Sequence, residues 1–229
     1  MELIEAIKSR KSIRGYKPTP IPKEILKEIL EIAIRAPSGV NSQPWEFTVL
    51  GGKPLDDLKQ ALQEKSLAGV EPHHDFPREP LTGVYKKRQS DLAVSMFQLM
   101  GIAREDTEKR SQWSLKGLRL FDAPNAIIIS MDKEISNNYM GMFGLGSVTQ
   151  TIALAAMDYG LGTCIQGAIA YYPEIVRRIA CIAESKKLVV GMAIGYPDWG
   201  SPANKLQSTR EPLADVVTWQ GVEHLTGKS

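Results

Sequence analysis

The segment from Ser9 to Tyr16, Ser-Arg-Lys-Ser-Ile-Arg-Gly-Tyr, concentrates side chains that suit a phosphate. Its three cations, at positions 10, 11 and 14, and the hydroxyl of Ser12 fall within five residues. Guanidinium groups offer planar pairs of donors that match phosphate oxygens, and each charge-assisted hydrogen bond contributes roughly 1.5–3 kcal/mol. The segment alone leaves a second interpretation open, a solvated basic helix end whose cations complement the helix dipole.

A second polar stretch runs from Ala36 to Trp45 and reads Ala-Pro-Ser-Gly-Val-Asn-Ser-Gln-Pro-Trp. Asn41 and Gln43 each offer one acceptor and two donors, which suits the edge of a ring that alternates carbonyl groups and nitrogens. A plain turn is the simpler alternative. Ten residues with asparagine, glutamine and tryptophan in series favour a binding function.

Several other kinds of site are not indicated. The sequence has no G-x-G-x-x-G after a strand, no G-x-x-x-x-G-K-[ST] loop and no G-x-S-x-G elbow. His73 and His74 are adjacent in a proline-rich stretch and cannot share a helix face, so no metal site is predicted. Cys164 and Cys181 form no C-x-x-C pair, which argues against a disulfide framework and favours a reducing cytoplasm. Cys164 is predicted to line the core or a loop.

Composition narrows the class of protein. With 229 residues, 43% of them hydrophobic, the chain has enough apolar material for a folded core. Its 28 Lys and Arg against 26 Asp and Glu give a net charge of +2, so nucleic acid is not expected as the main partner. The N-terminus lacks a basic leader followed by an apolar block, so no secretion signal is predicted.

The stretch from Ile135 to Met157 carries no charged residue. Asparagine, glutamine, threonine and glycine residues dilute it below the apolar content that a bilayer demands, so we predict no membrane span. A helix buried on all sides is the alternative. Because one modest domain needs less apolar surface than this for its own core, part of the stretch is predicted to contact a second subunit.

The apolar pattern outlines the elements that must position these polar stretches. Few long strands among many helices, without regular βαβ repetition, predict an α+β fold of one domain over residues 1–229. A candidate lid is expected within 67–120, because the pattern is lost from 67 to 91, and a C-terminal arm is expected at 205–229. Strands are expected at 46–50, 126–131 and 188–194, a loop at 163–168, and helices at 2–10, 22–36, 55–62, 92–104, 147–159 and 174–183.

Five short motifs, spread over nearly the whole chain, resemble in their order and spacing the motifs of the FMN-dependent nitroreductase family. The tail, Thr-Arg-Glu-Pro-Leu followed by Val-Thr-Trp, is most similar to the nitrobenzoate-reductase branch. The resemblance implies a central, mainly antiparallel sheet flanked by helices in an intertwined homodimer, with FMN at the subunit interface. The motifs are Ser-Arg-Lys-Ser-Ile-Arg at 9–14, the stretch at 36–45, Phe-Asp-Ala-Pro at 121–124, Tyr-Gly-Leu-Gly-Thr at 159–163 and Arg-Glu-Pro-Leu at 210–213.

The resemblance also implies which residues hold the cofactor. Arg10, Ser12 and Arg14 are expected at the phosphate and the flavin edge. Lys11 falls on the opposite side of an extended segment and is expected to be a solvated charge. The residues expected to reach the flavin from the partner subunit are Pro37, Ser38, Gly39 and Asn41, and Gln43 is counted with them as a cofactor-binding candidate.

Two further groups of residues complete the implied site. Arg210 is expected to close on the phosphate, assisted by either Ser208 or Lys205. Gln166 and Gly167 are expected to present backbone N–H groups to the flavin N5 region. Family members often carry an acidic residue at the position of Gln166, so the resemblance departs there, and redox tuning is the property this affects.

The activity implied is a ping-pong cycle in which NAD(P)H reduces FMN, and a nitroaromatic, a quinone or a related electron-poor small molecule is then reduced. The flavin carries this chemistry, so no side chain is assigned as catalytic. Alternatives on the same fold are enone reduction, reductive dehalogenation and flavin fragmentation. A non-catalytic flavin- or anion-binding module, or a basic-arm nucleic-acid binder, is a further alternative. The sequence leaves open the physiological acceptor, the choice of NADH or NADPH and the role of His73 and His74.

Overall fold

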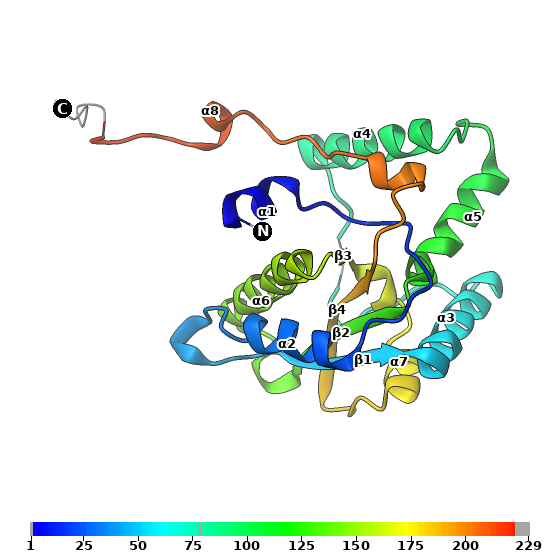
Figure 1. The fold of residues 1–229 in the computed structure, drawn as a ribbon, viewed down its shortest axis with the longest axis horizontal. Helices are drawn as coiled ribbons and strands as arrows, with labels where there is room; N and C mark the ends of the chain where they lie inside the picture. Colours follow the sequence, from blue (N-terminus) through cyan, green and yellow to red (C-terminus); the bar gives the residue numbers. More distant parts are fainter. Residues whose placement is uncertain (1, 78, 223–229) are drawn as a thin grey trace.

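Four antiparallel strands form the centre of the molecule (Figure 1). The computed structural model describes residues 2–77 and 79–222. In the order β1-β2-β4-β3, each strand pairs antiparallel with its neighbour. This confirms the predicted α+β fold with a mainly antiparallel sheet. The strands are β1 (Glu46–Gly51), β2 (Asn125–Asp132), β3 (Gly162–Gln166) and β4 (Lys186–Gly195).

Helices cover both faces of the sheet. On one face α2 (Lys23–Ala33) and α6 (Tyr139–Asp158) build a core with the sheet, and on the other α3 (Gly52–Leu67) and α7 (Pro173–Ala180) build a second core. The other helices are α1 (Leu3–Ser9), α4 (Gly83–Leu99), α5 (Thr107–Leu118) and α8 (Leu213–Val216), and short 3-10 turns occupy Gly39–Asn41, Leu120–Asp122, Lys133–Ile135, Gly167–Ala170 and Pro202–Lys205.

The sequence of β2 explains why both faces are covered. Successive strand residues point to opposite faces, and the run Asn-Ala-Ile-Ile-Ile-Ser-Met is buried along its whole length. Ile127 and Ile129 enter the core beneath α2 and α6, whereas Ile128 enters the core beneath α3 and α7. Each buried isoleucine contributes roughly 1.5–3 kcal/mol, so this strand strongly stabilises the arrangement of both layers.

Helix α6 has one face on the sheet and one face outward. Leu145, Val148 and Ile152 are buried, while Tyr139 and Phe143 are 80% and 63% exposed. Among the described residues α6 is the one helix long and apolar enough to cross a bilayer, a test that core helices of soluble proteins also pass. Its packing against the sheet is that of a core helix whose outer face is left apolar.

Several predicted element boundaries were wrong. Helix α4 spans Gly83–Leu99 instead of 92–104, α5 lies in a stretch to which no element was assigned, and β3 occupies part of the predicted loop. Helix α4 buries Met96 and leaves most of its length exposed, so its sequence carries no amphipathic period. Strand β3 is a five-residue edge strand, too short for a period-2 pattern to stand out.

The irregular stretch before α4 is fastened to the body of the protein. The Asp75 carboxylate pairs with Arg177 on α7 and accepts a 2.7 Å hydrogen bond from the backbone N–H of Leu188. The side chain of Arg177 is only 8% exposed. The Tyr172 hydroxyl also donates to the Val70 carbonyl at 2.8 Å. Residues 70–75 are therefore anchored beside α7 and the start of β4.

Replacing Asp75 by asparagine should be strongly destabilising, because it leaves the buried Arg177 guanidinium with only the exposed carboxylate of Glu184, 3.8 Å away, as a counter-charge. We expect the free energy of unfolding to fall by about 3 kcal/mol, measured by urea-induced unfolding. The control Asp57→Asn removes the exposed 2.8 Å pair with Lys53 and should cost less than about 0.5 kcal/mol. Equal losses for the two variants would contradict the anchoring role of Asp75.

Candidate functional site

The basic N-terminal segment runs alongside β3, an edge strand of the sheet. Ser12 forms a parallel bridge with Thr163, and the backbone N–H of Ile13 donates to the Thr163 carbonyl at 2.9 Å. A side chain at Gly162 would collide with Ile13, so glycine allows the segment to lie close against β3. The segment 9–14 is thus held beside the first residues of β3 by backbone contacts.

Asn204 fixes the position of Arg14. Its Oδ1 accepts a 2.7 Å hydrogen bond from the Arg14 backbone N–H, and its Nδ2 donates at 2.8 Å to the carbonyls of Gly15 and Asp198. The Asn204 residue is 1% exposed, and all three partners are backbone groups. A single buried asparagine in a loop gives no signal in the sequence, so the prediction missed it.

The side chain of Arg14 reaches the corner that follows α5. Its guanidinium lies 6.0 Å from the centre of the Phe121 ring, a cation–π distance. Phe121 belongs to a turn in which Leu120, Phe121 and Asp122 have φ values of 56°, 53° and 60°. Left-handed conformations cost non-glycine residues about 1–3 kcal/mol each and persist where surrounding contacts hold them.

Cys164 lies beneath the basic segment. It is 3% exposed, which confirms the predicted core position. Burial raises the pKa of its thiol, while Arg14, a hydrogen bond from Ser12 and Arg10 offset part of this rise. The electrostatic influence of Arg10, Ser12 and Arg14 on one thiol indicates that these predicted residues share a neighbourhood.

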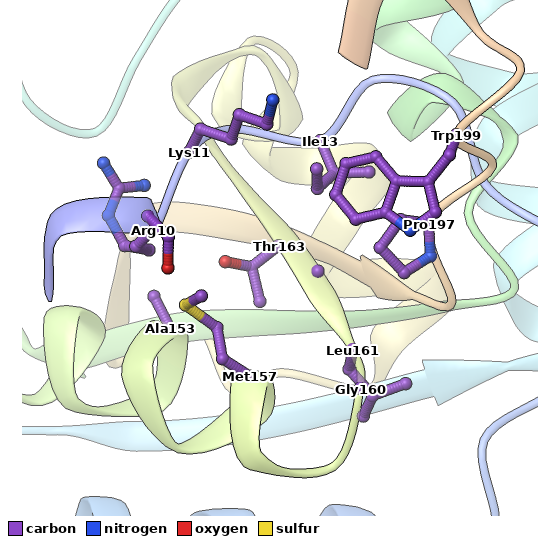
Figure 2. Close-up of a pocket in the computed structure, with 12 residues that line it drawn as sticks. Arg10, Lys11, Ile13, Ala153, Met157, Gly160, Leu161, Thr163, Pro197 and Trp199 are labelled. Atoms are coloured by element: carbon purple, nitrogen blue, oxygen red, sulfur yellow. The ribbon is translucent and has the colours of Figure 1, made fainter. Parts of the chain in front are cut away.

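Lys11 is half-buried and is not a freely solvated charge. Its Nζ atom is 5.5 Å from the centre of the Trp199 ring. The two residues line a mostly apolar cavity of about 210 Å³ that α6 closes with Ala153 and Met157 (Figure 2). Arg10 also lines this cavity.

Gln166 ends β3 with a buried side chain. Its Nε2 donates to the Gly117 carbonyl at 3.0 Å, and its Oε1 is buried without a hydrogen-bond partner. Gly167 begins the next turn, Gly167–Ala170, which packs on β4. This close packing needs glycine at position 191 of β4, because any side chain there would collide with Ile169. The backbone predicted to face the flavin is therefore built from an edge strand and a turn that close packing holds in place.

The second polar stretch lies at the other end of α6. Gly39 packs against Met140, and Ser38 packs against Gly144. Within the stretch, the Ser38 hydroxyl accepts a 3.0 Å hydrogen bond from the Gln43 backbone N–H. The predicted residues of this stretch are half-buried or exposed: Pro37, Ser38, Gly39, Asn41 and Gln43.

The two predicted halves of the site are not brought together within one chain. The second stretch contacts α6 at positions 140–144, and Arg10 lines a cavity with α6 residues 153 and 157. These contacts are 9 to 17 residues apart, or about 14–25 Å along a helix that rises 1.5 Å per residue.

Arg210 lies in the tail, beside α4. Its Nη1 donates to the Ser208 hydroxyl at 2.8 Å and to the Thr209 carbonyl at 2.7 Å. The tail and α4 enclose a space of about 460 Å³, and Glu211 pairs there with Arg88 of α4 at 2.7 Å. Of the two predicted helpers, Ser208 is therefore the one that contacts Arg210. The phosphate role of Arg210 stays a prediction.

Histidines and acids do not gather into a metal-binding group among residues 2–77 and 79–222. The His73 Nε2 atom lies 3.0 Å from the Glu174 Oε2 atom of α7, and the His73 backbone N–H donates to the Tyr171 carbonyl at 2.9 Å. This histidine therefore joins Asp75 in fastening the irregular stretch to α7.

Comparison with known proteins gives matches over most of the chain. The Nitroreductase family profile matches residues 7–196. The 4-nitrobenzoate reductase of Pseudomonas putida is 32% identical over 228 residues, which cover 96% of this chain and 94% of that protein. The nitroreductase NfnB of Mycolicibacterium smegmatis is 30% identical over 213 residues, which cover 92% and 89%. A solved structure, the FMN and NADPH-dependent nitroreductase NfnB from Sphigopyxis sp. strain HMH, has a TM-score of 0.91 at 29% identity and covers 96% of this chain and 100% of that chain.

These matches agree with the architecture described above. An antiparallel sheet between two helical layers is the fold that this chain shares with the solved nitroreductase. The chain belongs to the Nitroreductase family. The predicted resemblance, including its nitrobenzoate-reductase branch, is confirmed.

The two thiols should differ sharply in reactivity. Because burial raises the pKa of Cys164, little thiolate forms there near pH 8, and protein atoms also block access. Cys181 is exposed. We expect one thiol per chain to react quickly with an aromatic disulfide reagent, and the second at least about 100-fold more slowly until the protein is unfolded.

The Cys181→Ser variant identifies the fast thiol, because it should lose the rapid phase and keep the slow one. Two rapid thiols in the native wild-type protein would contradict the buried position of Cys164.

Proposed function

We propose that this protein is an FMN-dependent oxidoreductase that uses NAD(P)H to reduce nitroaromatics, quinones or related electron-poor small molecules by a ping-pong cycle. The observation that carries the proposal is the basic segment held alongside the edge strand β3, where Arg10, Ser12 and Arg14 all lower the pKa of one buried thiol, that of Cys164. The Sphigopyxis relative, which covers nearly the whole chain, depends on FMN and NADPH. These facts favour a flavoenzyme over a nucleic-acid binder.

The donor set fits FMN in charge and in kind. Arg10 and Arg14 supply cationic forks for a phosphate, and Ser12 supplies a hydroxyl. The backbone N–H groups of Gln166 and Gly167 lie on the adjoining edge strand and turn, which supports their proposed place near the flavin ring. Bound FMN would supply hydride chemistry, and the residues of this chain would bind it, orient it and hold positive charge beside it.

A homodimer is part of the proposal, because one chain holds only half of the proposed site. The residues from 37 to 43 lie at the N-terminal end of α6, so a second copy must bring its own stretch to the basic segment. Exposed apolar side chains supply a surface for such a partner. They lie on α1 (Leu3, Ile4, Ile7), on α6 (Tyr139, Phe143) and on the extended C-terminal tail (Leu213, Val216, Trp219), which projects away from the body in Figure 1.

The proposed domain organisation is one unit with a mobile cover and an arm. Residues 70–75 are anchored to α7, so the proposed lid within 67–120 is narrowed to the segment around α4. The proposed arm starts at 205, and its last described residue is Val222. We propose a cytoplasmic location, consistent with two unpaired cysteines.

The main competing function is another flavin reaction on the same fold. Enone reduction, reductive dehalogenation and flavin fragmentation would use the same cofactor site with a different acceptor. Anaerobic turnover with NADH and NADPH against nitroaromatics, quinones, enones and halophenols distinguishes them. Nitroaromatic and quinone reduction well above the other rates supports the proposal, and turnover of enones or halophenols alone would replace it.

The natively purified protein should carry flavin absorbance near about 450 nm, or gain it when FMN is added. Replacing Arg14 or Arg210 by alanine removes a proposed phosphate ligand and should weaken FMN binding by roughly 1.5–3 kcal/mol, one to two decades in Kd. Quenching of flavin fluorescence during titration of the flavin-free protein measures this.

Lys11→Ala is the matched control, since Lys11 points to Trp199 and should leave FMN affinity within about threefold of wild type. If both arginine variants keep wild-type affinity, the proposed pairing of the two chain ends is wrong. A protein that binds no FMN at all would refute the proposed function itself.

The dimer can be tested on the outer face of α6. Phe143→Glu places a charge on the proposed interface, and we expect a shift from dimer to monomer in sedimentation velocity with loss of FMN binding. Leu67→Glu, at the end of α3 and 64% exposed, is the control and should remain dimeric. A monomeric wild-type protein that binds FMN fully would contradict the proposal.

A further inference from the structure

Gln166 is the residue whose side chain the proposed function leaves unexplained. The residue is 8% exposed, and it stands at the end of the edge strand β3. Its Nε2 donates to the Gly117 carbonyl at 3.0 Å, while its Oε1 is fully buried without a partner. A buried acceptor without a partner is unfavourable, so a compensating role for this side chain is expected.

The partner of Gln166 dictates which chemical group can stand there. Gly117 lies in the last turn of α5, where carbonyl groups lack an intrahelical partner four residues on. A carbonyl accepts hydrogen bonds only, so the group facing it must carry a proton, and the amide orientation follows from this. An ionised carboxylate at position 166 would place two acceptors against each other.

The bond lies three residues before the strained corner that follows α5. Leu120, Phe121 and Asp122 all have left-handed backbones immediately after the helix that Gln166 contacts. Phe121 is the residue whose ring lies beneath the Arg14 guanidinium. A continuous set of contacts therefore runs from the end of β3 through Gly117 and the corner to a proposed FMN ligand.

We propose that the neutral amide of Gln166 is a positioning residue that ties β3 to the last turn of α5 and so holds Phe121 beneath Arg14. The FMN part of this inference rests on the proposed function. The Gly117 carbonyl supplies the physical reason for an uncharged donor at position 166.

Two variants separate the hydrogen bond from the space that the side chain fills. Gln166→Met keeps the length and loses the donor, so it should weaken FMN binding by about tenfold at every pH, the ratio for one lost hydrogen bond. Gln166→Glu can donate only when protonated. It should bind FMN within about threefold of wild type at pH 5.5 and at least about tenfold more weakly at pH 8.5.

Thermal unfolding of the flavin-free protein gives a readout independent of FMN. Burial and the facing carbonyl raise the pKa of the introduced carboxyl in the folded protein above its value of about 4.3 in the unfolded chain. Stability relative to wild type should therefore fall as pH rises from 5.5 to 8.5 in Gln166→Glu. In Gln166→Met the loss should be constant over this range.

The charged groups of α5 are Glu108, Lys109, Arg110 and Lys116; Arg119 and Asp122 follow the helix, and Arg14 faces the corner. They are present in every variant, so comparison with wild type at each pH removes their own titration. Gln98→Glu, an exposed glutamine of α4, is the control and should show neither pH-dependent loss.

A double-mutant cycle tests whether Gln166 acts through Arg14. The loss of FMN affinity in the Gln166→Met/Arg14→Ala protein should be smaller than the product of the two single losses. Full additivity, or a Gln166→Met protein with wild-type FMN affinity, would overturn the inference while the proposed function stands. If wild type binds no FMN, the proposed function fails. The stability measurement still tests the Gln166–Gly117 bond in that case, because a stability loss in Gln166→Glu that does not change with pH would refute it.

Discussion

The amide of Asn204 is the contact on which the site depends most. Its three hydrogen bonds reach the Arg14 N–H group, the Gly15 carbonyl and the carbonyl of Asp198 in the loop that follows β4. Buried amides whose donors and acceptor are satisfied fix geometry strongly, because breaking any one bond leaves a desolvated polar group. Asn204 thus joins two regions 190 residues apart and determines where the basic segment can run.

A basic cluster in a chain of nearly balanced charge has to be built locally. The net charge is +2, so the bulk of the surface creates no strong field for an anion. Arg10 and Arg14, four residues apart, both lower the pKa of the buried Cys164 thiol, and their partial burial makes each charge act more strongly than it would in water. The neutral Gln166 side chain adds no opposing charge to this neighbourhood.

Helix α6 connects the architecture to the proposed assembly. Its inner face completes one core, and its outer face keeps Tyr139 and Phe143 in solvent within one chain. The same helix separates the basic segment from the Pro37–Gln43 stretch, so both its surface and its length support a symmetric partner. The uncharged stretch from Ile135 to Met157 therefore has two explanations, one for each face of α6: packing on the sheet inside the chain and packing on the proposed partner outside it.

Most of the core elements could be predicted from local pattern. The strands β1, β2 and β4 and the helices α2, α3 and α7 have strong periodicity or continuous burial, and their predicted positions agree with the structure to within a few residues. Helix α4 was placed several residues too late, and α5 and β3 were missed, because exposure or short length removes the pattern on which such predictions depend.

The sequence by itself determined the family, the α+β class and the identity of the phosphate-type donors, because these depend on residue type and spacing. Only the tertiary structure decided which side chains meet. Asn204 beside Arg14, Phe121 beneath its guanidinium, Trp199 beside Lys11 and Gly117 opposite Gln166 are all contacts between distant segments. Such pairings follow from how the layers pack around the sheet, and no local pattern along the chain encodes them.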